Sequence, residues 1–240
     1  MAAGHRKIDL GMNEMKISVY AGTILGCLAL SWPMVSVAEW SANLGVVSLY
    51  KDRGVDQEGQ DDAIRPALQG GLDYAFDNGL YVGNWNSTGQ FGNAGMEVDL
   101  YAGYRLGFAQ DWLFDVGYVH YIYPGDAAWN AGEIYASIGY QRLTFKVYRG
   151  MREEVNKNDV YYRLTYTHPI MERLNLKAGV GYLEFDTADL RGKFDYGIGL
   201  DYSLNKFLSL SGTIAGANRK DDVEDHSRDT RFILGLNAVF

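Results

Sequence analysis

Few side chains of this sequence have the type and spacing for bond chemistry. After residue 38 the histidines are His120, His168 and His226. A hydrolase built on a β-strand would hold its histidine base and serine nucleophile on one face, two residues apart. No serine lies two residues from any of these histidines, and His168, which precedes Pro169, is better explained by a turn. We therefore predict no catalytic residue and no cofactor.

Two acidic segments have the composition of a cation site. Residues 220–229 contain His226 and five carboxylates, and residues 57–62 contain a second acidic group. Such segments either bind a divalent cation, assist hydrolysis, or form solvated charged loops. The one-three-five ligand spacing and the central glycine of a calcium loop are absent from 220–229. We predict solvated loops and no metal site.

The elements that must position these residues are β-strands. The chain has 29 glycines and 18 tyrosines but only 4 prolines, which favours a β-rich fold. No run of about 18 apolar residues follows the N-terminal region, which excludes a helical membrane protein. Period-two alternation predicts twelve strands, approximately at 40–49, 65–76, 80–87, 96–105, 113–123, 132–140, 143–150, 159–168, 174–185, 194–204, 208–217 and 230–240.

The connections between these strands alternate between long and short. Asn78-Gly79 is a strong hairpin signal, because both residues tolerate positive φ. Longer connections are predicted at 50–64, 88–95, 124–131, 151–158, 186–193 and 218–229. Short turns on one side and longer loops on the other are typical of an outer-membrane barrel. The predicted fold is thus all-β, a transmembrane up-and-down antiparallel β-barrel of about twelve strands.

Parity assigns the two faces of each strand. The apolar parity, for example Leu72, Val98 and Ile198, is predicted to face lipid. The opposite parity carries charge and is predicted to line a pore through Asp73, Glu97, Asp99, Arg105, Asp115, Glu133, Lys146, Arg163, Lys177, Asp195, Asp201 and Arg231. A soluble antiparallel barrel would show the same alternation with the faces reversed.

The predicted lumen is narrow and of mixed charge. A barrel of about eight strands is filled by side chains, and one of about sixteen leaves an aqueous channel. The interior of a twelve-stranded barrel is of intermediate width. Glycines at lumen positions such as Gly103 and Gly117 free volume, which favours a small water-filled pore with a slight cation preference. The alternative is a closed structural or surface-interaction barrel, crossed by paired charges and using its acidic loops to bind cations or partners.

Aromatic residues mark one end of the predicted strands. If the first strand starts on the periplasmic side, the six downward strands end on lipid-parity aromatics, which form a membrane girdle. Its predicted members are Tyr74, Phe76, Tyr104, Tyr140, Tyr166, Tyr202 and Phe240.

Residues 1–38 are predicted to form a cleaved signal peptide. Lys16 precedes an apolar run, and the run ends in the small-x-small pattern Ser36-Val37-Ala38. Met15 is a candidate for the true start. Residues 39–240 would then form the barrel, with no cysteine, since Cys27 lies in the leader. The net charge of −8 argues against binding to nucleic acid.

Four stretches, 41–54, 66–74, 79–85 and 97–104, resemble the TorF porin family. The resemblance implies a barrel in the cell outer membrane, in contact with outer-membrane lipid and lipopolysaccharide, and supplies no solute. The last strand with its terminal Phe240 resembles the signal that the barrel assembly machinery recognises in such proteins. The function we expect is a porin-like channel for passive diffusion of small polar solutes or ions.

Overall fold

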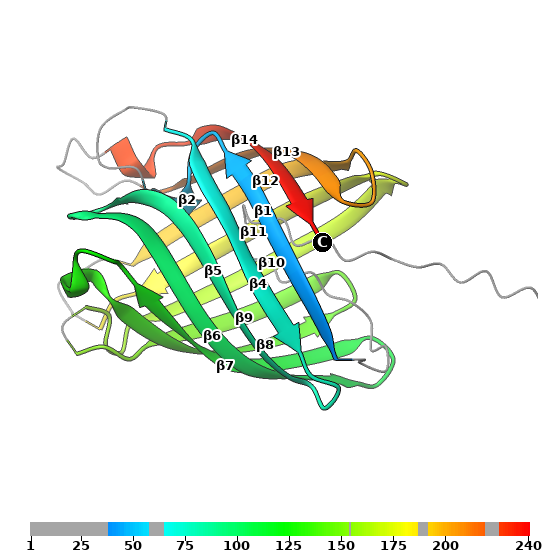
Figure 1. Cartoon of the computed structure of the whole chain (residues 1–240), viewed down its shortest axis with the longest axis horizontal. Helices are drawn as coiled ribbons and strands as arrows, with labels where there is room; N and C mark the ends of the chain where they lie inside the picture. Colours follow the sequence, from blue (N-terminus) through cyan, green and yellow to red (C-terminus); the bar gives the residue numbers. More distant parts are fainter. Residues whose placement is uncertain (1–37, 58–64, 154, 187–191, 219–225) are drawn as a thin grey trace, which may run out of the picture.

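The computed structural model describes residues 38–57, 65–153, 155–186, 192–218 and 226–240. It consists of one closed antiparallel barrel of twelve strands (Figure 1), which confirms the predicted fold class. The strands are β1 (Glu39–Val47), β4 (Ala67–Ala75), β5 (Leu80–Phe91), β6 (Ala94–Phe108), β7 (Trp112–Ile122), β8 (Ala131–Tyr140), β9 (Leu143–Gly150), β10 (Val160–Met171), β11 (Leu174–Glu184), β12 (Lys193–Ser203), β13 (Leu208–Ala217) and β14 (Arg231–Val239).

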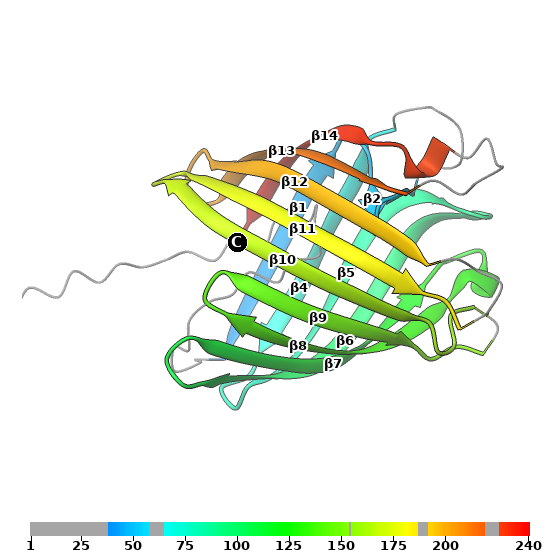
Figure 2. The same cartoon turned by 180° about the vertical axis from the view of Figure 1, so that it is seen from behind.

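Sequential strands pair with one another, and β1 pairs with both β4 and β14 to close the cylinder. At the closure the N–H of Ala42 donates to the carbonyl oxygen of Phe240 at 3.1 Å, and the N–H of Phe240 donates to the carbonyl oxygen of Ala42 at 2.9 Å. Closure leaves none of these twelve strands with an unpaired edge, which is the condition for a β-structure in lipid. Figure 2 shows the barrel from behind, with the tilted strands β10, β11 and β12 towards the viewer.

The two ends of the barrel differ as the sequence predicts. One end carries the short connections, among them the turn after β4, where Gly79 has a φ of +91°. The other end carries most of the long ones, and includes two short 3₁₀ helices, η1 (Ala127–Trp129) and η2 (His226–Arg228). No described helix is long and apolar enough to cross a membrane. The predicted leader, except for Ala38, and most of both acidic segments lie outside the described residues.

Two predicted boundaries are wrong. The loop expected at 88–95 is largely strand, because β5 and β6 continue as a hairpin to Phe91 and Ala94, across an irregularity in their register. The turn expected at His168 is also strand. Strand β10 runs on through Pro169 and ends beyond a register shift, a place where a strand tolerates a proline.

The two faces of the wall have opposite character. Large apolar side chains such as Leu72, Leu100 and Ile198 are exposed on the outside, whereas the inward parity carries charged and polar groups, many of them buried. The seven predicted girdle residues are all on the outer parity. Tyr104 does not end its strand, because β6 continues to Phe108, whose ring stacks on Trp112.

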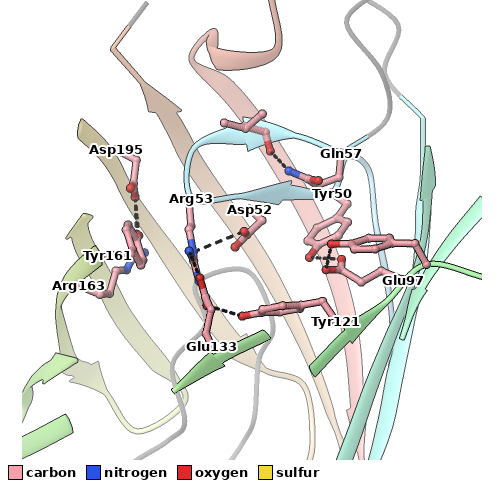
Figure 3. Close-up of polar contacts among 12 residues, drawn as sticks. Tyr50, Asp52, Arg53, Gln57, Glu97, Tyr121, Glu133, Tyr161, Arg163 and Asp195 are labelled. Atoms are coloured by element: carbon pink, nitrogen blue, oxygen red, sulfur yellow. Dashed lines mark hydrogen bonds and ion pairs between the residues drawn. The ribbon is translucent and has the colours of Figure 1, made fainter. Parts of the chain in front are cut away.

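A small hairpin inside the barrel was not predicted from the sequence. Strands β2 (Lys51–Asp52) and β3 (Val55–Asp56) form a separate two-stranded sheet, in the segment that we expected to be an outer loop. The segment instead contacts inward-facing residues of several barrel strands, at the end where the long loops lie (Figure 3).

Candidate channel constriction

The β2–β3 hairpin owes its shape to a turn with two positive φ angles. Arg53 and Gly54 have φ of +44° and +76°, the pattern of a type I′ turn, whose twist suits a tight hairpin. Lys51 pairs with Asp56 and Asp52 with Val55 across it. The turn places the Arg53 side chain at the tip of the hairpin, away from the strand from which the segment departs.

Arg53 anchors the tip to the opposite wall. Its Nη1 and Nη2 donate to Oε1 and Oε2 of Glu133 on β8 at 2.9 and 2.5 Å, and Tyr121 donates to the same carboxylate at 2.8 Å. The guanidinium also lies over the rings of Tyr148 and Tyr161, 5.1 and 4.3 Å from their centroids. Bidentate pairing and stacking on aromatic rings are the two interactions for which arginine is suited.

The base of the hairpin is tied to β14 by a second set of charges. Lys51 forms an ion pair with Asp56 and donates to the carbonyl of Ser227 at 2.9 Å. Nε of Arg231 on β14 lies 3.4 Å from Oδ2 of Asp56. Asp56 therefore pairs with Lys51 within the hairpin and links the hairpin to the barrel wall through Arg231.

Tyr50, which precedes β2, fixes the hairpin to a third part of the wall. Its hydroxyl donates to Oε2 of Glu97 on β6 at 2.9 Å, and Tyr123 donates to the other oxygen of that carboxylate at 2.9 Å. The Tyr50 ring meets the rings of Trp85 and Phe91 edge-on, at 5.5 and 6.5 Å.

Burial is the largest influence on the pKa values of the titratable groups in the hairpin. Burial lowers the pKa of Lys51 and raises the pKa of Asp56, although their mutual attraction opposes both changes. Burial also raises the pKa of the Tyr50 hydroxyl well above its ordinary value, and the negative charges of Glu97 and Asp52 add to this. For Arg53, burial is outweighed by Glu133, so that its pKa is raised and it stays charged.

The turn packs closely against a fourth part of the wall, and no room is left there for a side chain at Gly54. A Cβ at Gly54 would lie 2.6 Å from the carbonyl oxygen of Gly216, 2.7 Å from Cβ of Ala217 and 2.8 Å from Cβ of Asp195. Glycine is therefore required for both its φ and its lack of a side chain. Together the four contacts hold the hairpin across the interior of the barrel.

A polar network lines the wall nearer the short-turn end. The Tyr81 hydroxyl donates to Oδ1 of Asp115 and contacts the Tyr135 hydroxyl, both at 2.6 Å. Arg105 lies 3.9 Å from the other oxygen of Asp115 and stacks over the Tyr81 ring. Separately, Tyr101 donates to Asp73 at 2.5 Å.

The β9–β12 wall carries the remaining basic residues. Arg163 pairs with Asp195 at 2.6 Å, and the Tyr161 hydroxyl also donates to Asp195 at 3.2 Å. Lys177 lies 3.6 Å from Asp201, and Nζ of Lys146 lies 3.7 Å from the Tyr135 ring centroid. Several predicted lumen charges are therefore paired across strands.

All twelve charged residues predicted to line a pore lie on the inward parity of their strands. Sequence reasoning missed the tyrosine hydroxyls that bind five of the predicted acids: Asp73, Glu97, Asp115, Glu133 and Asp195. It also missed the hairpin residues. The available signal was parity, which puts Tyr81, Tyr101, Tyr121, Tyr135 and Tyr161 on the charged face of their strands.

The prediction that lumen glycines leave open volume is wrong at several positions. The space where side chains of Gly103, Gly117 and Gly181 would lie is filled by the tyrosines Tyr81, Tyr135 and Tyr161. Glycine lets each ring lie flat against its neighbouring strand. The glycines therefore accommodate a tyrosine lining.

The histidines do not approach a serine nucleophile in the described hydrogen bonds. His120 and His168 lie on the outer parity and contact Tyr118 and Tyr166 at 3.2 and 3.1 Å. His226 pairs with Asp229 at 3.0 Å. Among the described residues, no group of three histidine, cysteine or acidic side chains has the arrangement for a metal ion.

Comparisons with known proteins agree with this architecture. A family described as "Bacterial protein of unknown function (Gcw_chp)" matches residues 34–240, whereas the TorF name stays a resemblance. No curated protein matches the sequence. Solved structures with a similar fold include the KdgM porin, with 11% identity, a TM-score of 0.59 and coverage of 83% of this chain and 99% of that one.

Two further structures have the same fold. The KdgM porin in complex with disordered oligogalacturonate has 11% identity and a TM-score of 0.60, over 83% of this chain and 99% of that chain. The NanC porin has 9% identity and a TM-score of 0.53, over 84% and 99%. At such identities the likeness concerns the fold.

Proposed function

We propose that this chain, which belongs to the Gcw_chp family of bacterial proteins of unknown function, is an outer-membrane channel for passive diffusion of small polar solutes or ions. The observation that carries the proposal is a closed barrel with an apolar outer face and a charged inner face. A lipid-facing wall around a polar interior is the arrangement of a transmembrane channel. Its similarity in fold to porins supports the same function.

The hairpin sets the expected size and charge of the solutes. It carries Lys51, Asp52, Arg53 and Asp56 into the lumen, where acidic and basic groups are nearly balanced and mostly partnered. Solutes must pass beside it, so that we expect small molecules to cross and long oligomers to be hindered. The KdgM porin is described in complex with oligogalacturonate; the hairpin in the lumen of this barrel disfavours an oligomer here.

The proposed location is the cell outer membrane, where the exposed aromatic and aliphatic side chains would contact lipid and lipopolysaccharide. The C-terminal strand, which closes the barrel at Phe240, would be the segment that the barrel assembly machinery recognises. In this function no residue makes or breaks a covalent bond, and the lumen residues act by charge and shape.

Planar-bilayer recording on refolded protein tests the proposal. We expect discrete conductance steps in potassium chloride, and swelling of proteoliposomes in small sugars but not in large oligosaccharides. A matched control is the same bilayer with protein left unfolded in urea. Current no larger than in the control would contradict a channel.

The alternative is a closed structural barrel whose acidic loops bind cations or partners. The specific observation in its favour is the hairpin, which is held across the lumen by the Arg53–Glu133 and Asp56–Arg231 pairs. A wild type without conductance that becomes conducting when these pairs are removed would favour the closed barrel over the channel.

A further inference from the structure

We infer that two copies of this chain associate side by side in the membrane, through a pair of asparagines on the outer face of β5. The pair consists of Asn84 and Asn86, which lie on the parity that faces lipid. Strand β5 and its neighbours β4 and β6 lie on the wall towards the viewer in Figure 1. The inference requires an outer face in lipid, as in the proposed function, but it does not require a conducting lumen.

The first step is the position of the asparagine pair within the lipid-facing band. Asn84 and Asn86 are the fifth and seventh residues of the twelve in β5, so that they lie far from both ends of the strand. Their partners on β6 are Leu100 and Val98, and the outward residues of β6 are apolar along the whole strand. The two amides therefore lie at a depth where the wall meets hydrocarbon and where water does not satisfy polar groups.

The second step is that the barrel itself satisfies only part of the hydrogen-bonding capacity of the two amides. The N–H of Leu72 on β4 donates to Oδ1 of Asn84 at 3.2 Å. Nδ2 of Asn86 donates to the carbonyl oxygen of Gly70 at 3.1 Å. Within the described part of the chain these are the hydrogen bonds of the two side chains. The NH₂ group of Asn84 and the side-chain oxygen of Asn86 are left without a partner, and such groups are costly in hydrocarbon.

The third step identifies what satisfies these groups. An acyl chain has no donor or acceptor, whereas the asparagine of a second copy has both, an NH₂ group and a carbonyl oxygen. Two barrels in one membrane have the same orientation, so that a twofold axis along the membrane normal places each asparagine at the depth of its counterpart. The amides can then bond reciprocally. Side-chain hydrogen bonds of this kind hold membrane-spanning segments together.

The surroundings of the pair suit a close contact with a second barrel. Gly70, which lies beside Asn86 on β4, has no side chain to cover the amide. On either side of it Leu68 and Leu72 are 56% and 44% exposed, and Leu100 on β6 is 48% exposed. In the contact these leucines surround the central hydrogen bonds and keep lipid away from them, as the apolar rim of a buried polar contact does.

Sedimentation equilibrium of the refolded chain in density-matched micelles tests the association without requiring conductance. We expect a monomer–dimer equilibrium. The double variant Asn84→Leu, Asn86→Leu should raise the dissociation constant of the dimer about tenfold, which corresponds to about 1.4 kcal/mol. The matched control is Asn175→Leu, which makes the same replacement on the inward parity of β11 and should leave the dissociation constant unchanged.

Disulfide cross-linking in membrane vesicles locates the contact and keeps both asparagines. Cys27 is the only cysteine of the chain, so that single cysteines can be placed in a Cys27→Ser background. Val82→Cys lies two residues from Asn84 on the outward parity and should give a covalent dimer on oxidation. Val180→Cys is equally exposed but lies on β11, on the opposite side of the barrel, and should stay monomeric.

A monomer at every protein concentration, an equal loss of dimer in Asn175→Leu, or equal cross-linking through the cysteine at position 180 would overturn the inference. The cross-linking result decides the question even where the double variant does not refold. A dimer that shows no conductance would leave the interface standing and refute the channel. A conducting barrel that stays monomeric would refute the interface alone.

Discussion

Arg53 at the tip of the hairpin and Glu133 near the start of β8 form a two-point ion pair, with N–O distances of 2.9 and 2.5 Å. The pair joins two residues 80 positions apart in the sequence, and it ties the tip of the hairpin to the barrel wall. The side chains are 17% and 7% exposed, so that the pair is weakly screened by solvent. A single substitution can thus remove one of the four contacts that hold the hairpin.

Arg53→Ala should widen the channel. Breaking a buried ion pair costs about 3 to 5 kcal/mol when the other charge stays buried, but a hairpin that leaves the lumen returns Glu133 to water and reduces this cost. We expect at least a twofold rise in single-channel conductance. The control is Arg142→Ala, because the Arg142 side chain is exposed and contacts His168. An unchanged conductance in Arg53→Ala would contradict a hairpin that narrows the passage.

Gly54→Ala should also displace the hairpin, although it removes no charge. The added Cβ would lie within 3 Å of Gly216, Ala217 and Asp195 atoms that cannot move cheaply, and overpacking of this kind costs about 1 to 3 kcal/mol. The expected result is the higher conductance of Arg53→Ala. Gly125→Ala provides the comparison, since its φ is +103° and its nearest atom is 3.7 Å away, so that it keeps the backbone strain without the clash.

Gly117→Val should destabilise the barrel by displacing the Tyr135 ring. A side chain there meets the Tyr135 hydroxyl and the carbonyl of Ala102, and the Tyr81–Tyr135 contact would be lost. We expect a decrease of about 1 to 3 kcal/mol in the free energy of unfolding, measured by urea titration in micelles. A Cβ at Gly95 would have no atom within 4 Å, so that Gly95→Val should change the free energy of unfolding little. An equal decrease in Gly95→Val would show that displacement of the Tyr135 ring does not explain the loss of stability.

Phe240→Ala tests the proposed recognition by the barrel assembly machinery. The backbone bonds between Ala42 and Phe240 do not need the ring, so that refolding into micelles should be unchanged. In cells, the amount of folded protein in the outer membrane should fall severalfold. Phe207→Ala removes the ring that stacks on Phe240; if it lowers the yield as much, packing at the strand end explains the effect and recognition does not.

The sequence by itself determined the wall of this protein. A strand exposes alternate residues to opposite sides, so that parity placed Leu72 outside and Asp73 inside before any tertiary contact was known, and the same holds for Ile198 and Asp201. Asn78-Gly79 marked its turn because its local conformation depends on those two residues. The wall follows from local rules, and local rules can be read from one sequence.

Only the tertiary structure decided what fills the interior of the barrel. Residues 50–57 have the polarity of an outer loop, and nothing local says that Arg53 would meet Glu133 or that Asp56 would meet Arg231. The tyrosines over Gly103 and Gly117 are also set by the register of neighbouring strands. These contacts depend on closure of the cylinder, which brings distant strands around one enclosed space, and their partners are therefore fixed by geometry that no single segment contains.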